Sequence, residues 1–63
     1  MLYCVNKYGD HEVHKVAVCS YLPEERNRIN FIANSDAEAM QKAKTHYSNA
    51  DGCKHCMSAY HKR

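Results

Sequence analysis

The chain has 63 residues, and its hydrophobic share of 44% includes five tyrosines and four cysteines, so large aliphatic residues are few. A domain this short buries a small share of its surface, while ordering it costs about 1.5 kcal/mol per residue. The formal net charge of +2 lies below the strongly basic balance of a dedicated nucleic-acid-binding domain. We therefore expect one domain, residues 1–63, that needs a disulfide, a metal ion or a partner chain for stability.

The first residues also bear on the compartment. Residues 1–3 lead directly into a polar, alternating segment rather than into the apolar core of a signal peptide. No run approaches the roughly 18 apolar residues that span a bilayer. These features predict a cytoplasmic protein with no membrane partner. Disulfides are rare in that compartment, and cysteine patterns there more often bind metal.

The first half of the chain is typical of β-structure. Residues 2–8 and 11–18 alternate between the two faces of a strand, and Gly9 between them can take a positive φ. This pattern predicts an antiparallel hairpin. Pro23 then interrupts the alternation, because it cannot continue a strand ladder. The short apolar run in residues 28–33 predicts a third strand.

The strongest local signal is a helix start at Ser35. Ser35 and Glu38 form a capping box, in which each side chain satisfies an otherwise unpaired amide. The residues that follow favour a helix, and Met40, Ala43 and Tyr47 recur at helical spacing to give one apolar stripe. The sequence thus predicts one main helix in the second half of the chain.

The end of the chain contains a second turn signal. Gly52 or Asn49 is expected to end the helix in the left-handed conformation. The tail after Cys56 is expected to form a last helical turn. Together these elements predict an α+β fold, in which a small three-stranded antiparallel sheet is combined with one main helix and a zinc knuckle.

The knuckle is the Cys-x-x-Cys sequence Cys53-Lys54-His55-Cys56, which lies just after the glycine turn. Such a turn brings two thiolates to one metal ion and leaves the amides of Lys54 and His55 free to donate to sulfur. A redox dithiol of the thioredoxin kind would instead open a helix after a strand. We therefore expect two metal ligands here, and zinc as the metal, because structural zinc takes four nitrogen or sulfur ligands.

His14 and Cys19 are the upstream residues favoured as the other two ligands. They lie where a strand breaks into a loop, so both side chains can face one point. The strand alternation puts His14 on the face of Val16 and Val18, which we expect to be the apolar side. The alternatives for this position are His11, His55, His61 and Cys4, the last of which would complete an all-cysteine site.

Several motifs in this chain also follow a known order. They are Val13-His14, Cys19, Asn27-Arg28-Ile29-Asn30-Phe31, Ser35 with Ala37-Glu38-Ala39, and Cys53-Lys54-His55-Cys56. This order resembles the zinc-binding domain at the N-terminus of the bacterial Ada alkylation-response protein and its stand-alone relatives. Short bacterial proteins with an Asp-His-Glu-Val-His…Cys…Asp-Gly-Cys-x-x-Cys…His pattern are similar too. Together the two likenesses cover Asp10 to His61.

The resemblance implies a small α+β, Ada-like metal-binding fold in which His14, Cys19, Cys53 and Cys56 hold zinc. In Ada the first ligand is a cysteine whose thiolate accepts a methyl group. This chain has His14 at that position, and an imidazole on zinc is not that nucleophile. Methyl transfer is therefore not expected.

The function expected from the sequence is a monomeric binding module with structural zinc, and not an enzyme. A zinc-activated water would need an open coordination position and usually a nearby carboxylate base. Nucleic acid or protein is the expected partner, and no small-molecule substrate is inferred. The residues of the expected basic face are Lys42, Lys44, Lys54, Lys62 and Arg63, with Tyr47 and Tyr60 as stacking groups. The alternatives are a metal carrier or sensor, and a thiol-redox protein that uses Cys53 and Cys56.

Overall fold

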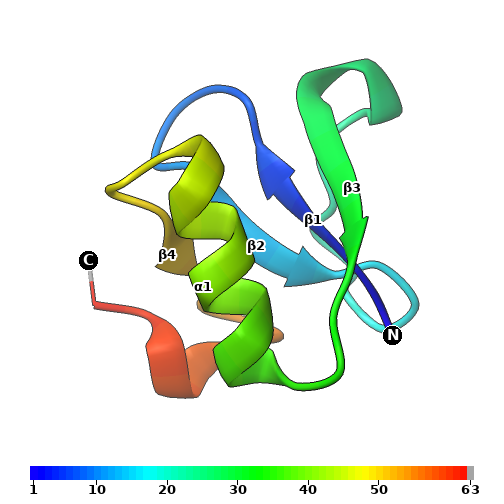
Figure 1. Ribbon diagram of the computed structural model, residues 1–63. Coiled ribbons are helices and arrows are strands. Elements are labelled where there is room, and N and C mark those ends of the chain that lie inside the picture. Colours follow the sequence, from blue (N-terminus) through cyan, green and yellow to red (C-terminus); the bar gives the residue numbers. More distant parts are fainter. Residues whose placement is uncertain (63) are drawn as a thin grey trace.

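A computed structural model describes residues 1–62 as one helix on a four-stranded mixed sheet, which is an α+β fold (Figure 1). The strands lie in the order β3-β1-β2-β4. β1 (Leu2–Asn6) pairs antiparallel with β2 (Glu12–Lys15) and with β3 (Arg28–Ile32). β4 (Asp51–Gly52) pairs parallel with β2. The predicted class is therefore correct. The expected three-stranded antiparallel sheet is wrong, because the sheet has a fourth, short strand that is parallel to β2.

The hairpin of β1 and β2 is shorter than the alternation indicates. After Lys15 the chain turns, and the amides of Val18 and Cys19 both donate to the Lys15 carbonyl, at 3.2 and 3.0 Å. This turn directs Cys19 back toward β2 and leaves Val18 64% exposed. At the hairpin tip Gly9 has the predicted positive φ of 67°, while the φ of 52° at His11 was not predicted.

The core lies between the sheet and helix α1 (Asp36–His46), which packs on β1 and β2 (Figure 1). The odd-numbered strand residues point into this core. Its fully buried members are Tyr3, Val5, Val13, Ala33, Ala39 and Ala43. The expectation that His14 faces the apolar side is thus wrong, because Val13 faces the core. His14 lies on the opposite face of the sheet, where its register partner is Cys4.

Helix α1 begins as predicted, with Ser35 as its N-cap. The Ser35 Oγ accepts a hydrogen bond from the Glu38 amide at 3.1 Å. The return bond differs by one residue, since the Glu38 carboxylate accepts from the amide of Asn34 at 3.1 Å. The apolar stripe is confirmed in that Met40 and Ala43 are buried, while Tyr47 is half-buried.

The turn after α1 differs from the expectation. Tyr47 ends the helix in an extended conformation, and neither Asn49 nor Gly52 has a positive φ. Gly52 is needed for space instead. A Cβ there would lie 2.7 Å from the Met57 carbonyl oxygen and 2.8 Å from the Tyr60 Cβ. The tail therefore packs against the backbone of β4.

Two short 3-10 helices complete the fold. η1 (Glu25–Asn27) precedes β3, and η2 (Ser58–Tyr60) is the helical turn expected near the end of the chain. β4 continues its pairing with β2 through the Cys53 amide, which donates to the Val13 carbonyl at 2.9 Å. This bond places Cys53 beside His14, the residue after Val13. No helix in residues 1–62 is long and apolar enough to cross a membrane.

Candidate metal centre

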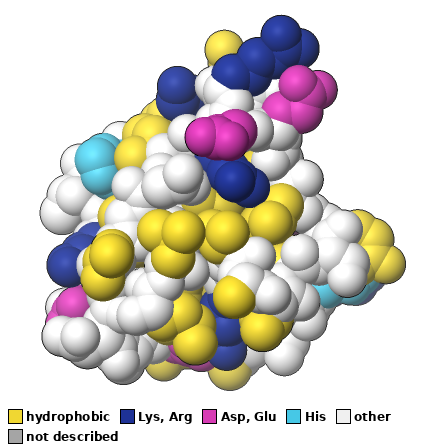
Figure 2. Space-filling model, turned by 90° about the vertical axis from the view of Figure 1, so that its right-hand side faces the viewer, with side chains coloured by type: hydrophobic (Ala, Val, Ile, Leu, Met, Phe, Trp, Pro, Cys, Tyr) yellow, Lys and Arg dark blue, Asp and Glu magenta, His cyan; other side chains and the backbone are white. Residues whose placement is uncertain are grey.

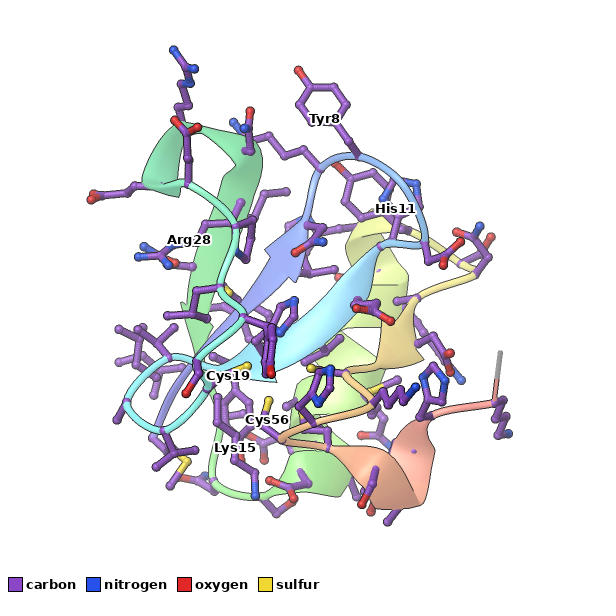
Figure 3. All side chains as sticks on the ribbon, turned by 180° about the vertical axis from the view of Figure 1, so that it is seen from behind. Tyr8, His11, Lys15, Cys19, Arg28 and Cys56 are labelled. Carbon is purple, nitrogen blue, oxygen red and sulfur yellow. The ribbon has the colours of Figure 1, made fainter. Side chains whose placement is uncertain are left out.

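Four side chains from separate parts of the chain converge on the side of the sheet opposite α1. His14 comes from β2, Cys19 from the turn after it, and Cys53 and Cys56 from the knuckle after β4. Their ligand atoms all lie within 4.8 Å of one another. Figure 3, which views the molecule from behind, shows Cys19 and Cys56 close together in front of β2. The structure thus brings together the four residues that the sequence indicated.

Two of the distances between donor atoms match the edges of a tetrahedral metal site. Cys19 Sγ lies 3.8 Å from Cys53 Sγ and 3.5 Å from His14 Nδ1. Zinc bonds of about 2.3 Å to sulfur and about 2.0 Å to nitrogen give tetrahedral edges of about 3.8 Å between sulfurs and about 3.5 Å between sulfur and nitrogen. Three thiolates and an imidazole are ligands that zinc favours. The donor set therefore fits zinc in both chemistry and spacing.

The orientation of His14 is fixed from behind by Asn6. His14 Nε2 lies 3.1 Å from the side-chain oxygen of Asn6, which can only accept a hydrogen bond. Nε2 therefore carries the proton, and the lone pair of Nδ1 faces Cys19. Burial, together with the Arg28 and His55 charges, lowers the pKa of His14, so the imidazole is neutral as a metal ligand must be. Sequence reasoning missed this partner, although the alternation places Asn6 on the Cys4 face.

Each of the three sulfurs accepts one backbone amide. Tyr21 donates to Cys19 at 3.4 Å, and His55 donates to Cys53 at 3.4 Å, each from two residues further along the chain. Lys15 donates to Cys56 at 3.3 Å from the end of β2. Such bonds are stronger when the acceptor is a charged thiolate. Only the His55 bond was predicted. The Tyr21 bond repeats the same local geometry after Cys19, whereas the Lys15 bond depends on how the chain folds back.

The Cys56 thiol is difficult to ionise without a cation. Burial, and to a smaller extent the neighbouring Cys19 and Cys53 thiols, raise the pKa of Cys56 to about 12, against a lowering by the Lys15 amide. A thiol with so high a pKa is a poor nucleophile. A coordinated metal ion removes this penalty, since it deprotonates the thiols that bind it. Cys56 is therefore better suited to binding a metal ion than to acting as a free nucleophile.

Arg28 supplies positive charge near the site. Its Nε is buried without a hydrogen-bond partner in residues 1–62, and its Nη1 donates to the Pro23 carbonyl at 3.4 Å. The Arg28 charge lowers the pKa of both Cys4 and His14, although burial is the larger influence on each. Three thiolates and one zinc ion would carry a net charge of about −1. The positive charge of the Arg28 guanidinium would offset part of that charge.

The alternative ligands lie outside the cluster. Cys4 is fully buried on the same face, but it does not belong to the group of converging donors. The His11 ring stacks on Tyr47 with centroids 3.8 Å apart. His61 Nδ1 lies 3.0 Å from the Gly52 carbonyl oxygen. These contacts hold both histidines away from the knuckle sulfurs.

His55 instead forms an exposed pair with Tyr21. Their rings stack with centroids 3.9 Å apart, and both residues are exposed. Each residue also donates its amide to a cysteine of the cluster, so the stack joins the two loops that follow Cys19 and Cys53. Lys54, beside His55, is exposed as well. The molecule thus has aromatic and basic groups at the surface next to the candidate metal centre.

Comparison with known proteins gave no relative. A scan against protein-family models and searches of curated proteins and of solved structures found no match to this chain. The likeness to the Ada domain therefore stays a prediction from the motifs.

Proposed function

We propose that the protein is a small zinc-binding module in which His14, Cys19, Cys53 and Cys56 hold one structural zinc ion. The observation that supports this most directly is the pair of donor separations, 3.8 and 3.5 Å, which match the edges of a zinc tetrahedron. Four nitrogen and sulfur donors also fill the coordination of zinc, which is the pattern of structural rather than catalytic sites.

A structural ion has much to stabilise in this chain. Cys19 and Cys53 are 34 positions apart in the sequence, so the ion would close a long loop. The aliphatic and aromatic core consists largely of alanine and short side chains. Structural zinc contributes about 10–16 kcal/mol in small peptides, which is enough to decide whether a domain of this size folds.

Chelation tests this proposal. Native mass spectrometry of the reduced protein should show one zinc ion per chain, and a strong chelator should remove it. The dispersed amide spectrum of the protein should collapse as the ion is lost, because metal binding and folding are coupled. A chain that stays folded and monomeric without metal would contradict a structural role.

A metal carrier or sensor is the second candidate, favoured by the partial exposure of Cys19 and Cys56. Exposed thiolates give chelators and other apoproteins access to the ion. In a carrier, zinc would exchange quickly and the chain would keep its fold after transfer. The same chelation experiment separates the two, since a structural site loses zinc and fold together.

For the partner, we propose a protein or nucleic-acid surface that meets the exposed pair of Tyr21 and His55 beside Lys54. The stacked rings and the lysine offer flat apolar area next to positive charge. The basic face expected from the sequence is less available. The Tyr47 ring is stacked on His11, Lys42 Nζ donates to the Ile32 carbonyl at 2.6 Å, and Arg63 lies outside the described residues.

Binding to single-stranded nucleic acid at low salt tests one of the two partner classes. If bases stack on the exposed pair, Tyr21→Ala should weaken binding by about 1–3 kcal/mol. Lys44→Ala is the matched control, because Lys44 lies on the exposed side of α1. Equal affinity of both variants would exclude this surface for nucleic acid, and a total lack of low-salt affinity would leave protein as the partner class.

A further inference from the structure

The outer edge of β3 exposes backbone N–H and C=O groups, only some of which are hydrogen-bonded within residues 1–62. β3 is an edge strand, with β1 on one side only. The Met1 and Ala33 backbones exchange two hydrogen bonds, at 3.0 and 3.1 Å. This exchange shows which opposed residue pairs of β1 and β3 are hydrogen-bonded. Antiparallel pairs alternate between bonded and non-bonded, so Phe31 and Ile29 bond to β1. The backbone groups of Arg28, Asn30 and Ile32 therefore point outward.

Two of these six outward groups are already satisfied within the chain. The Arg28 amide donates to the Glu25 carbonyl in η1. The Ile32 carbonyl accepts from Lys42 Nζ at 2.6 Å. The Arg28 carbonyl, both backbone groups of Asn30 and the Ile32 amide have no hydrogen-bond partner in residues 1–62. These four groups are what a further strand can reach.

We propose that two copies of this chain pair antiparallel through β3, around a two-fold axis at Asn30. In that register the two Asn30 residues exchange two hydrogen bonds. The Ile32 amide of each copy donates to the Arg28 carbonyl of the other copy. All eight free groups of the two edges are then paired. A complete antiparallel ladder would also have a bond from the Arg28 amide of each copy to the Ile32 carbonyl of the other. Both of these groups are already hydrogen-bonded within their own copy, so neither needs a partner across the interface.

The side chains at this edge support the same register. Half-buried Phe31 would lie opposite Ile29 of the other copy, and Ile32 would lie opposite the stem of Arg28. Ile32 is 64% exposed in the single chain, and its neighbours Leu2 and Met1 are exposed as well. The space-filling view of this side shows apolar side chains gathered across its middle, with the largest group of charged side chains at the top and others at the left and lower edges (Figure 2). Pairing would remove part of this apolar surface from water.

A second copy suits this edge better than an unrelated extended peptide. A peptide laid along β3 would place its own carbonyl and amide opposite the two satisfied groups, so those two atoms would find no partner on the strand. The β3 strand of a second copy has the corresponding atoms bonded internally. Lys42 and η1 also limit the pairing to one short stretch, and such features protect edges against open-ended association.

The interface is small, so the dimer is weak. A pair of five-residue strands falls below the area of about 1,200 Å² that stable complexes bury. The dissociation constant for dimerisation is therefore expected to be high, up to about 1 mM. Such a dimer differs from the monomer expected from the sequence. It is independent of the proposed partner surface, which lies at the metal centre.

Isotope-filtered NMR on the zinc-loaded chain tests the dimer directly. A mixture of labelled and unlabelled protein at about 1 mM, where weak complexes form, should give an intermolecular contact between the Hα atoms of Ile29 and Phe31. These two residues form a non-hydrogen-bonded pair, in which Cα atoms are closest. Translational diffusion should slow over the same concentration range. A chain that diffuses as a monomer throughout, or a dimer without this contact, would overturn the proposal.

Asn30→Pro provides the matched variant, because its amide faces outward and proline removes no bond within the chain. It takes away two of the four intermolecular bonds and should weaken association by at least about tenfold. Asn30→Thr keeps the amide and should dimerise like the parent. Dimerisation of Asn30→Pro equal to that of Asn30→Thr would also overturn the proposal. If the proline variant fails to fold, the Hα contact in the parent protein decides.

Discussion

The face of the sheet that packs on α1 and the face that carries the candidate metal ligands, called the metal face below, are built from alternate residues of the same strands. In β1, Tyr3 and Val5 point to the helix, while Cys4 and Asn6 point the other way. In β2, Val13 joins the apolar core and His14 joins the sulfurs. The two-residue alternation along each strand therefore gives the sheet one apolar face and one face of polar and sulfur-containing side chains.

The two faces differ in how their residues stabilise the fold. The helix face is apolar and works through burial, but it relies on small residues such as Ala39 and Ala43. The other face holds polar side chains whose burial would be costly without partners. A metal ion reverses that cost by bonding them together. We infer that in so short a chain the metal face contributes more to stability than the apolar face.

The largest effect is expected from breaking the metal face. Cys53→Ser removes a buried ligand, and the chain should lose zinc and unfold, because structural zinc contributes about 10–16 kcal/mol. Cys4→Ser is the control, since Cys4 is buried on the same face without belonging to the cluster. It should keep one zinc ion and lose only about 1–3 kcal/mol. Zinc content by mass spectrometry and circular dichroism check both variants. Unfolding of both alike would contradict the special role of the cluster.

A smaller loss is expected on the apolar face. Met40→Ala opens a cavity where α1 meets the sheet and should reduce the free energy of unfolding by about 2–5 kcal/mol. The zinc content should stay at one ion per chain, because Met40 lies on the side away from the ligands. Denaturant unfolding with zinc present measures the loss. A change in zinc content would show that the two faces are not separable.

Asn6 connects the metal ligand to the strand behind it. Asn6→Ala removes the acceptor of His14 Nε2 and should lower zinc affinity by about 10- to 100-fold, as is usual for such supporting partners. Asn30→Ala, another asparagine on a neighbouring strand, should leave the affinity unchanged. Competition with a chelator of known affinity compares the two. Equal affinities would mean that His14 is oriented by packing alone.

The smallest expected effect is a loss of stability at alkaline pH, which comes from Tyr3 on the helix face. The Tyr3 hydroxyl donates to Asp36 at 2.6 Å, and this bond, with burial, raises the pKa of Tyr3 from 10.0 to about 12. The unfolded chain therefore loses this proton before the folded one does. The stabilisation is complete below pH 10, and it is lost as the pH rises toward 12. Urea unfolding at several alkaline pH values should show this decline in the parent chain and a smaller one in Tyr3→Phe.

Much of the fold could be predicted because its signals are local. The alternation around Gly9 predicts the hairpin, and Ser35 with Glu38 fixes where α1 begins. The four clustered residues could also be found, because Cys-x-x-Cys is a strong pattern and zinc needs two further donors. Cys19 follows a strand end, where a side chain can turn back toward that strand.

The remaining features depend on contacts between distant parts of the chain. β4 has two residues, too few for any periodicity, and it forms only because β2 is there to pair with. The side of His14 was predicted wrongly, because Val18 looks like a core residue in sequence but lies in an exposed turn. Asn6 and Tyr21 became visible as neighbours of the cluster only in three dimensions.

X-ray absorption at the zinc edge tests the central claim most directly. The reduced, zinc-loaded chain should show three sulfur ligands at about 2.3 Å and one nitrogen ligand at about 2.0 Å. His14→Ala should remove the nitrogen contribution or the ion itself, whereas His11→Ala should change neither. A first shell of four sulfurs, or a zinc ion bound mainly by oxygen, would contradict the account.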